Sequence, residues 1–136
     1  MDFTLTQEQE QFRRSTRSVL NTVVDTDMRQ SVVRTGVAHD KRLARALADE
    51  GLLSQAAPGP DRDPVLLHLL FSEMEKAGAP YEGLAVNLLV AGVLDTVGSD
   101  MHRNLVVGPL LSGDKNVCLG YSEPEAGSDP AGMKTR

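Results

Sequence analysis

Apolar residues recur at steps of three and four positions along most of the chain, which is the spacing of one buried face of an α-helix. The first such face consists of Phe12, Thr16, Val19, Leu20 and Val23. Thr6 is a suitable helix N-cap, and Gln9 three residues later completes a capping box. The pattern predicts a helix from Thr6 to about Val24. The mixed segment 25–37 fits either a continuation of this helix or a second short turn.

The next helices have clear boundary residues. Asp40 can cap a helix, and Gly51 falls where a left-handed C-terminal cap belongs. Residues 54–62 contain two prolines, a glycine and little periodicity, and therefore predict a loop. Asp63 followed by Pro64 is a strong start signal for a third helix, because a carboxylate caps well and proline suits the first helical position.

The third helix is expected to stop at Gly78, before Pro80. Residues 82–97 are apolar nearly all round, so we expect a fourth helix that is buried on most of its sides. The leucines expected to be most buried there in the complete protein are Leu84, Leu88, Leu89 and Leu94. In this chain they are expected to keep some exposure, because part of the covering surface is missing. A fifth, shorter helix can begin at residues 99–100, with Pro109 breaking or kinking it.

The pattern changes after residue 114. Residues 116–121, NVCLGY, resemble a short strand, and a loop of turn-forming residues follows it. Residues 133–136 look like the start of a second strand. We therefore expect a mainly α fold, with an N-terminal bundle of about five helices over residues 1–114. Residues 115–136 would begin a truncated β-domain, because an isolated strand leaves its hydrogen bonds unpaired. The chain is then the front part of a longer protein.

Composition and charge exclude several classes of protein. The 136 residues are 40% hydrophobic and 24% charged, as in a globular domain, and a net charge of −5 argues against nucleic-acid binding. The single Cys118 lies in an apolar run and is expected to be a buried, inert thiol, and three scattered histidines give no metal-binding spacing. The N-terminus shows no leader, and the longest uncharged stretch, residues 83–94, is too short for a membrane span. A reduced, cytoplasmic protein is expected.

Searches for catalytic motifs find little, with one exception at residues 119–128, LGYSEPEAGS. No nucleophile turn, acid–base carboxylate pair or nucleotide-binding glycine loop is present. In the exception, Gly120 and Gly127 permit close backbone approach, and the hydroxyls of Ser122 and Ser128 can bind a polar heterocycle or a phosphate. Alternatively, residues 123–127 form an ordinary turn with residue 128 or 129 as a cap. The spacing alone leaves both interpretations open.

The sequence of this segment also resembles a known family. YSEPEAGSDPAGMKT closely resembles the flavin-binding signature of the acyl-CoA dehydrogenases. MDFTLTQEQEQFRRSTRSVL and LARALADEGLL resemble the first two helices of that family, and FSEMEKAGAPY resembles a later helix with its turn. NLVVGPLLSGDKNVCLGYSEPEAGSD resembles the passage into the central β-domain. The resemblance covers the whole chain.

The resemblance implies FAD as cofactor and an acyl-CoA thioester as substrate, which is oxidised to the 2,3-enoyl-CoA. The residues that would contact FAD are Leu119, Gly120, Tyr121, Ser122, Glu123, Pro124, Glu125, Ala126, Gly127 and Ser128. Ser122 would lie near the reactive flavin nitrogen, and Ser128 near the pyrophosphate and the substrate. Residues 83–94 would wall the acyl channel. An electron-transfer flavoprotein or similar acceptor, and a homo- or hetero-oligomer such as a dimer or tetramer, are also implied.

The resemblance has two departures. The loop after the second helix reads AAPGPDRDPV where the family usually has Pro-Glu-x-x-Gly-Gly-x-Gly. The family's catalytic glutamate belongs to a later part of the protein, so no carboxylate here is assigned that role, and no metal ligand is assigned. The alternative function is a non-catalytic helical interaction module, or a partner subunit derived from the same family.

Overall fold

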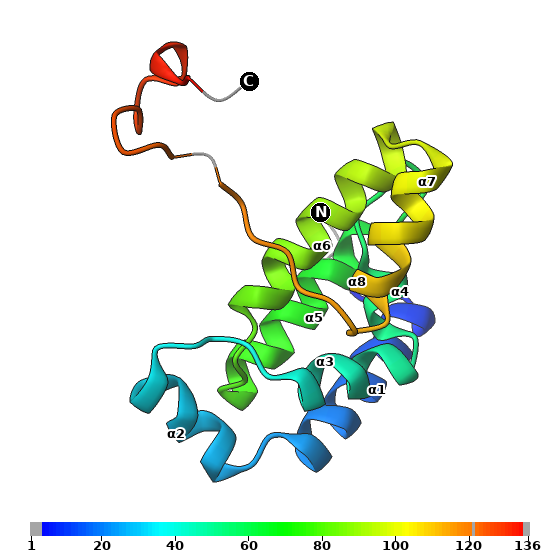
Figure 1. Cartoon of the computed structure of the whole chain (residues 1–136). Coiled ribbons are helices and arrows are strands. Elements are labelled where there is room, and N and C mark those ends of the chain that lie inside the picture. Colours follow the sequence, from blue (N-terminus) through cyan, green and yellow to red (C-terminus); the bar gives the residue numbers. More distant parts are fainter. Residues whose placement is uncertain (1–3, 121, 135–136) are drawn as a thin grey trace.

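The computed structural model describes residues 4–120 and 122–134, and within these ranges the chain is mainly α-helical (Figure 1). The elements are α1 (Gln7–Val23), α2 (Thr26–Thr35), α3 (Lys41–Asp49), α4 (Leu52–Ala56), α5 (Pro64–Ala77), α6 (Glu82–Val97), α7 (Asp100–His102), the π-helical turn η1 (Arg103–Val107), α8 (Gly108–Leu111) and the 3-10 turn η2 (Pro130–Gly132). The predicted fold class is confirmed, with more helices than the five that were expected.

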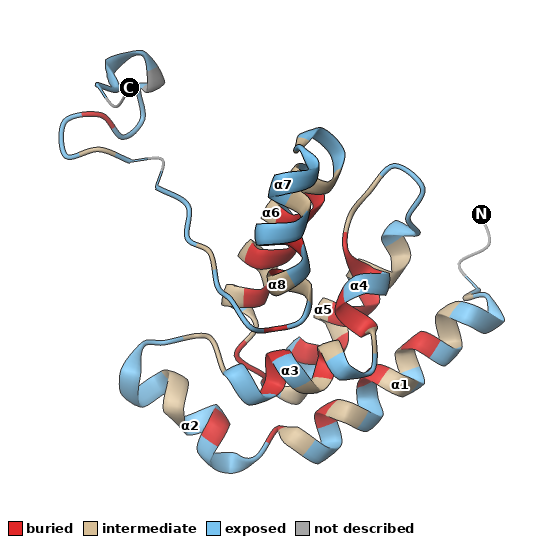
Figure 2. Cartoon of the chain, turned by 45° about the vertical axis from the view of Figure 1, so that its right-hand side comes forward, coloured by how far each residue is buried: buried red, intermediate tan, exposed pale blue. Residues whose placement is uncertain are grey.

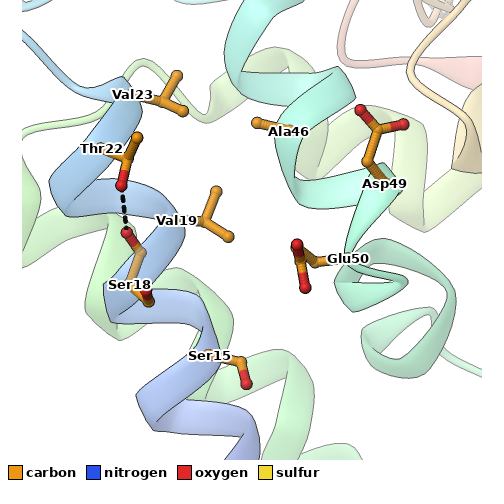
Figure 3. A pocket seen from close by; sticks show the side chains of 8 residues that line it. All are labelled: Ser15, Ser18, Val19, Thr22, Val23, Ala46, Asp49 and Glu50. Carbon is orange, nitrogen blue, oxygen red and sulfur yellow. Dashed lines mark hydrogen bonds between the residues drawn. The ribbon is translucent and has the colours of Figure 1, made fainter.

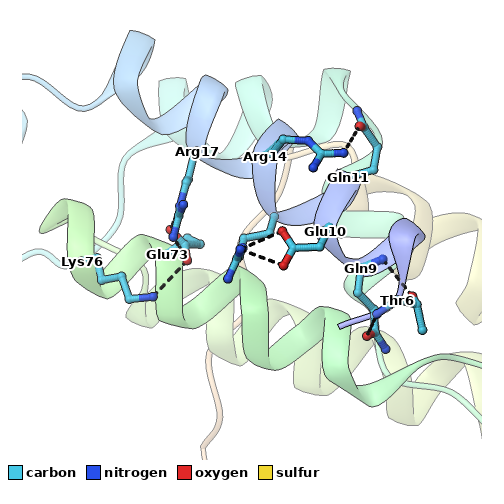
Figure 4. Close-up of polar contacts among 9 residues, drawn as sticks. Thr6, Gln9, Glu10, Gln11, Arg14, Arg17, Glu73 and Lys76 are labelled. Carbon is cyan, nitrogen blue, oxygen red and sulfur yellow. Dashed lines mark hydrogen bonds and ion pairs between the residues drawn. The ribbon is translucent and has the colours of Figure 1, made fainter. Parts of the chain in front are cut away.

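The predicted capping residues begin the helices as expected. The Thr6 hydroxyl accepts the Gln9 N–H at 3.2 Å, while the Gln9 side chain accepts the Thr6 N–H at 2.9 Å (Figure 4). Asp40 caps α3 by accepting from two backbone N–H groups, and Asp63 accepts from the Val65 N–H at 2.9 Å to begin α5. Gly78 ends α5 with a φ of 65°, a left-handed conformation in which a side chain would be strained.

Two short helices were not predicted. The ambiguous segment 25–37 contains the separate helix α2, because Asp25 accepts the Met28 N–H at 2.7 Å and starts a new helix. The loop predicted over residues 54–62 is shorter, because α4 extends to Ala56. Leu52, Leu53 and Ala56 are buried on α4, so packing stabilises a helix whose sequence is too short to show a period.

The predicted break at Pro109 does not occur, and the chain stays helical to Leu111. The widened turn η1 precedes the proline, which fits the expectation of a local distortion. Proline has no N–H to donate to the carbonyl four residues before it. The ammonium of Lys115 contacts that Leu105 carbonyl at 3.4 Å and compensates for the missing donor.

Most of the core lies among α1, α3, α4, α5 and the first half of α6 (Figure 2). Its least exposed members include Leu43, Leu47, Leu53, Leu70 and Met74, each with 0% exposure. A smaller cluster of Ala91, Val107 and Leu110 joins the second half of α6 to η1 and α8. In α6, Leu84 and Leu88 are buried as predicted, and Leu94 is half-buried. Leu89 is 52% exposed on the uncovered side of the helix, so its burial in the complete protein stays a prediction.

One carboxylate is buried between α1 and α5. Glu73 is 4% exposed, and it accepts hydrogen bonds from Arg17 at 2.5 and 3.1 Å and from Lys76 at 3.0 Å (Figure 4). The hydrogen bond from Arg17, assisted by Lys76, lowers the pKa of Glu73 although burial acts in the opposite direction. The carboxylate therefore stays ionised inside the bundle.

The segment after α8 differs from its prediction. Residues 115–120 are irregular, and the described residues form no strand, only an isolated bridge between Glu123 and Ala126. Figure 1 shows the chain after α8 passing along the helices and then running away from them, where no described segment pairs with it as a strand. Residues 133 and 134 are also irregular, and the rest of the second predicted strand lies outside the described residues. In the described part of the chain, no helix is long and apolar enough to cross a membrane.

Candidate functional site

Residues 122–134 fold into a small turn of their own. The backbone groups of Glu123 and Ala126 bond reciprocally, at 3.0 and 3.2 Å, around Pro124 and Glu125. Lys134 closes the turn, because its N–H donates to the Glu123 carboxylate at 2.8 Å and its ammonium pairs with Glu125. Ala126 is 4% exposed inside this turn. The segment therefore has defined local structure without help from the helices.

The second half of the turn contains a cap. Asp129 accepts the Ala131 N–H at 3.0 Å through its side chain and the Gly132 N–H at 3.1 Å through its backbone carbonyl. It thus caps η2, as the alternative interpretation of this segment anticipated for residue 128 or 129. A capped turn does not compete with ligand binding, because the cap engages Asp129 rather than the two serines.

The predicted cofactor-binding residues are mostly open to solvent. Ser122, Pro124, Glu125, Gly127 and Ser128 are exposed, as are Leu119 and Gly120 before them, whereas Glu123 is half-buried and Ala126 buried. A Cβ added at Gly120 or Gly127 would meet no atom within 4 Å, so a ligand can approach the backbone closely there. Tyr121 lies outside the described residues. Hydroxyls and open backbone are the donor set that suits a polar ring or a phosphate, so these residues fit part of a flavin site.

The expectation for Cys118 is wrong, because its thiol is exposed. The apolar run around it suggested a buried strand, but residues 118–120 have left the bundle and pack against nothing that would cover them (Figure 2). Val117, one residue earlier, still packs against the smaller core cluster. The chain therefore passes from packed to exposed between residues 117 and 118.

An apolar groove lies along the second half of α6. It has a volume of about 310 Å³ and is lined by Pro58, Gly59, Leu89, Gly92, Val93, Thr96 and Val97. Val93 and Val97 are 52% and 76% exposed, and the next elements also expose apolar side chains, with Met101 at 61% and Leu105 at 60%. Gly92 permits the loop 57–63 to approach α6 closely, because a Cβ at residue 92 would lie 2.6 Å from the Pro58 Cγ. Such a surface can accommodate an apolar ligand or another part of a protein.

A second hollow, of about 400 Å³, separates α1 from α3 (Figure 3). Ser15, Ser18 and Thr22 line it from α1, and the carboxylates of Asp49 and Glu50 face them. Thr22 donates its hydroxyl to the Ser18 carbonyl at 3.0 Å. Both carboxylates are exposed, and in the described ranges no three histidine, cysteine or acidic residues converge as metal ligands. This hollow has no chemistry beyond a polar surface.

Sequence reasoning missed Asn87, a buried residue of α6 that bonds to the start of the exposed segment. Its side chain is 1% exposed and contacts Lys115, Asn116 and Val117. The available signal was a single amide within the apolar run LAVNLLV. A buried amide must find hydrogen-bond partners, so that signal indicates a fixed contact but not its location.

Comparisons with known proteins identify relatives of this chain in sequence and in fold. The family model for the N-terminal domain of acyl-CoA dehydrogenases matches residues 6–114. Acyl-CoA dehydrogenase FadE29 of Mycobacterium tuberculosis is 28% identical over 138 residues, covering 96% of this chain and 35% of the relative. The probable acyl-CoA dehydrogenase YdiO of Escherichia coli K12 is 29% identical over 133 residues, covering 95% of this chain and 34% of the relative.

Solved structures give the same result. A chain in the ChsE4–ChsE5 complex of M. tuberculosis matches with a TM-score of 0.77 and 28% identity, over 99% of this chain and 35% of the other. A chain of the Tcur3481–Tcur3483 steroid ACAD matches with a TM-score of 0.75 and 29% identity, over 100% of this chain and 37% of the other. The present chain thus spans about a third of the length of these relatives.

Proposed function

This chain belongs to the acyl-CoA dehydrogenase family, because the family's N-terminal domain model matches residues 6–114, and we propose that it is the N-terminal part of an FAD-dependent acyl-CoA dehydrogenase. The proposed reaction removes the α-proton of an acyl-CoA thioester and transfers a hydride from the β-carbon, leaving the 2,3-enoyl-CoA. When bound, FAD supplies the redox chemistry by accepting the hydride. We place the domain boundary near residue 114, where the matched region ends.

The observation that carries this proposal is the exposed, locally ordered turn after α8. Of the proposed cofactor-binding residues, Leu119 to Ser128, those from residue 122 onward belong to this turn. The hydroxyls of Ser122 and Ser128 are exposed, so they are available to the flavin ring and to the pyrophosphate with the substrate, respectively. Gly120 and Gly127 leave room for close approach of the backbone. The reciprocal bonds of Glu123 with Ala126 support the proposal by ordering the loop before a ligand arrives.

We assign the catalytic base to no carboxylate of this chain. Glu73 is buried, paired with Arg17 and Lys76, and has a lowered pKa, which makes it a poor proton acceptor. Glu123 and Glu125 accept from Lys134 within the turn. The groups of this chain are therefore proposed to bind and orient, while the proton is abstracted by a glutamate that the resemblance places in a later domain.

The groove on α6 is the proposed wall of the acyl channel. Leu89, Val93 and Val97 expose apolar surface on one side of the helix, and Pro58 with Gly59 closes the groove at one edge. An acyl chain gains free energy from contact with such a surface in proportion to the apolar area that it covers. The loop 57–63 is the part that departs from the usual family sequence, so it is expected to shape this groove differently from that of relatives.

An oligomeric assembly is the last part of the proposal. Of the two solved relatives described above, one is named as the ChsE4–ChsE5 complex, and the other has the paired name Tcur3481–Tcur3483. The exposed apolar side of α6 to η1 supports contacts with other polypeptide, and the resemblance implies a homo- or hetero-oligomer. The exposed apolar surface also favours a second function, that of a non-catalytic subunit which packs against a full-length relative. Electron-transfer flavoprotein or a similar acceptor would reoxidise the flavin.

FAD titration tests the proposal. The isolated chain is expected to quench flavin fluorescence weakly and to lack acyl-CoA oxidation, because one loop supplies few of the contacts needed to offset the lost freedom of the ligand. Supplying the later domains of a relative as a separate polypeptide should restore tight binding. In that mixture, replacing both Ser122 and Ser128 with alanine should weaken FAD binding by roughly tenfold to a hundredfold, about three- to tenfold for each hydroxyl.

Ser31→Ala, on α2 and away from the loop, is the matched control and should bind FAD as the wild type does. Stoichiometric flavin binding with turnover by the isolated chain would contradict the assignment of the base elsewhere. Equal binding by the double variant and the wild type would contradict the role of the loop. Copurification with a full-length relative, without flavin at this loop, would favour the second function.

A further inference from the structure

Asn87 is a buried polar residue placed among apolar neighbours in the middle of α6. Its side chain is 1% exposed, and the residues beside it in sequence are Val86 and Leu88. A buried amide without partners would destabilise the fold, so its position requires an explanation in terms of hydrogen bonds. Those bonds are made to a segment that is distant in sequence rather than to the helix itself.

Both the nitrogen and the oxygen of the Asn87 side-chain amide form hydrogen bonds. The Asn87 Nδ2 donates to the Lys115 carbonyl at 3.2 Å and to the Asn116 Oδ1 at 2.9 Å. Its Oδ1 accepts the Val117 N–H at 3.0 Å. Residues 115–117 have no regular secondary structure, so this side chain satisfies backbone groups that a neighbouring strand would otherwise satisfy.

The segment before this contact is fixed from several sides. The Lys115 N–H donates to the Pro109 carbonyl at 3.1 Å, and Arg45 of α3 pairs with Asp114 at 2.9 Å. Gly113 packs against the backbone of α3, where an added Cβ would lie 2.8 Å from the Ala44 carbonyl carbon. Residues 118–120 are exposed instead. The contact with Asn87 therefore lies between this fixed segment and the residues proposed to bind flavin, 119–128, which we call the flavin loop.

We propose that Asn87 is a positioning residue for the flavin loop, because its amide fixes where, and in which direction, the chain leaves the bundle after residue 117. The inference rests on the proposed function of that loop. Leu89, Gly92 and Val93, which line the apolar groove, follow Asn87 on the same helix. One rigid helix would thereby hold the start of the flavin loop in a constant relation to the wall of the acyl channel.

The single cysteine offers a direct test on the isolated chain. Cys118 is exposed and adjoins Val117, so a nitroxide label on its thiol reports how firmly the start of the loop is held. Asn87→Leu keeps a similar volume and removes all three hydrogen bonds. We expect a more mobile label, with helix content unchanged by circular dichroism, and amide exchange at Val117 faster by about tenfold. Thr16→Val, which removes another buried polar group bonded only within α1, should change neither readout.

A pH-dependent rescue separates positioning from a general packing defect. In Asn87→Asp, a protonated carboxyl can donate one hydrogen bond, where the amide donates two, and its other oxygen can still accept the Val117 N–H, whereas the ionised form has no proton to donate to the Lys115 carbonyl. Burial should raise the pKa of the introduced carboxyl. The label in this variant should therefore be mobile at neutral pH and become held as the pH falls, while the wild type measured over the same range stays held throughout.

The flavin measurement uses the mixture with the later domains described above. Asn87→Leu should weaken FAD binding at least several-fold if the loop is misdirected. A label that stays held in Asn87→Leu would overturn the inference about Asn87 without affecting the proposed function. A mobile label with unchanged FAD binding would overturn the proposed flavin role of the loop. Loss of helix content in Asn87→Leu, without rescue of Asn87→Asp at low pH, would assign Asn87 to core stability and overturn its positioning role.

Discussion

On one side of α6, Leu84 and Leu88 are 1% and 2% exposed within the large core, whereas on another side Leu89, Val93 and Val97 are 52%, 52% and 76% exposed. Both sides consist of apolar residues. They differ in what covers them, since Leu84 and Leu88 belong to the large core, whereas Leu89, Val93 and Val97 line an open groove. We call the large core the closed region and the side of α6 with the groove the open region.

A helix that is apolar on all sides is expected to be covered on all sides. The residues that cover it need not belong to the part of the chain that the structure describes. The closed region supports a complete core and even a buried ion pair at Glu73. The open region retains an apolar surface that water covers unfavourably. Asn87, which holds the start of the proposed flavin loop, is a buried residue of the same helix. Stability and function are therefore expected to respond to different substitutions.

The largest expected effect comes from two adjacent leucines. Leu88→Ala should lower the free energy of unfolding by about 2–5 kcal/mol, because it leaves a cavity in the closed region. Leu89→Ala removes the same atoms from an exposed position and should change it by less than ~1 kcal/mol. Urea titration followed by circular dichroism measures both. Equal losses would show that the two sides of α6 are not distinguished as described.

Local signals in the sequence were sufficient for most helix boundaries and insufficient for the orientation of α6. Asp40, Asp63 and Gly78 act within two to four residues of themselves, so their roles follow from the sequence alone. That Leu89 rather than Leu88 is exposed could not be predicted, because a helix that is apolar all round gives no periodic signal of which side is covered. α4 was missed because five residues cannot display a helical period.

The candidate site depends on contacts between segments that are far apart in the sequence. Asn87 bonds to residues 28 to 30 positions later, and no pattern links the two segments. The strand expected at residues 116–121 has apolar alternation but no described partner to pair with, and Cys118 is exposed for the same reason. The cofactor-binding role of residues 119–128 stays a prediction that rests on family resemblance, whereas the turn at Glu123–Ala126 follows from its turn-forming residues.

The boundary between the two regions can be disturbed at Gly92. A Cβ there would lie 2.6 Å from the Pro58 Cγ and 2.9 Å from its carbonyl oxygen. Gly92→Ala should therefore destabilise the chain by about 1–3 kcal/mol, because the 57–63 loop must move. Gly120→Ala, where nothing lies within 4 Å, is the control and should change stability by less than ~0.5 kcal/mol. Thermal unfolding would contradict the close approach if the two variants behaved alike.

A smaller, pH-dependent effect is expected in the closed region. Because the pKa of Glu73 lies below its ordinary value of 4.5, the folded state favours the ionised form more than the unfolded state does. Its contribution is therefore fully present above about pH 5 and is lost as the pH falls through the lowered pKa. Glu73→Gln should be less stable than the wild type at pH 7, with a difference that narrows below about pH 4.5.

Urea titrations at several pH values measure this difference. Glu8→Gln, which removes an exposed carboxylate from α1, controls for the change in net charge and should follow the wild-type pH profile. A stability difference between Glu73→Gln and the wild type that stayed constant from pH 7 to pH 3 would show that the carboxylate contributes by packing rather than by its charge.

The smallest effect on stability is expected at the exposed side of α6, where function rather than folding should respond. Val93→Ser and Val97→Ser should each change the free energy of unfolding by less than ~0.5 kcal/mol, because both side chains are largely exposed and valine and serine have similar helix propensities. The double variant should nevertheless bind a fluorescent apolar dye more weakly, since it makes the groove more polar. Val33→Ser, at a residue of α2 that is 90% exposed and outside the groove, should leave dye binding unchanged. If Val33→Ser reduced the dye signal as much as the double variant does, exposure alone would account for dye binding, and the groove on α6 would lose its distinction from the rest of the surface.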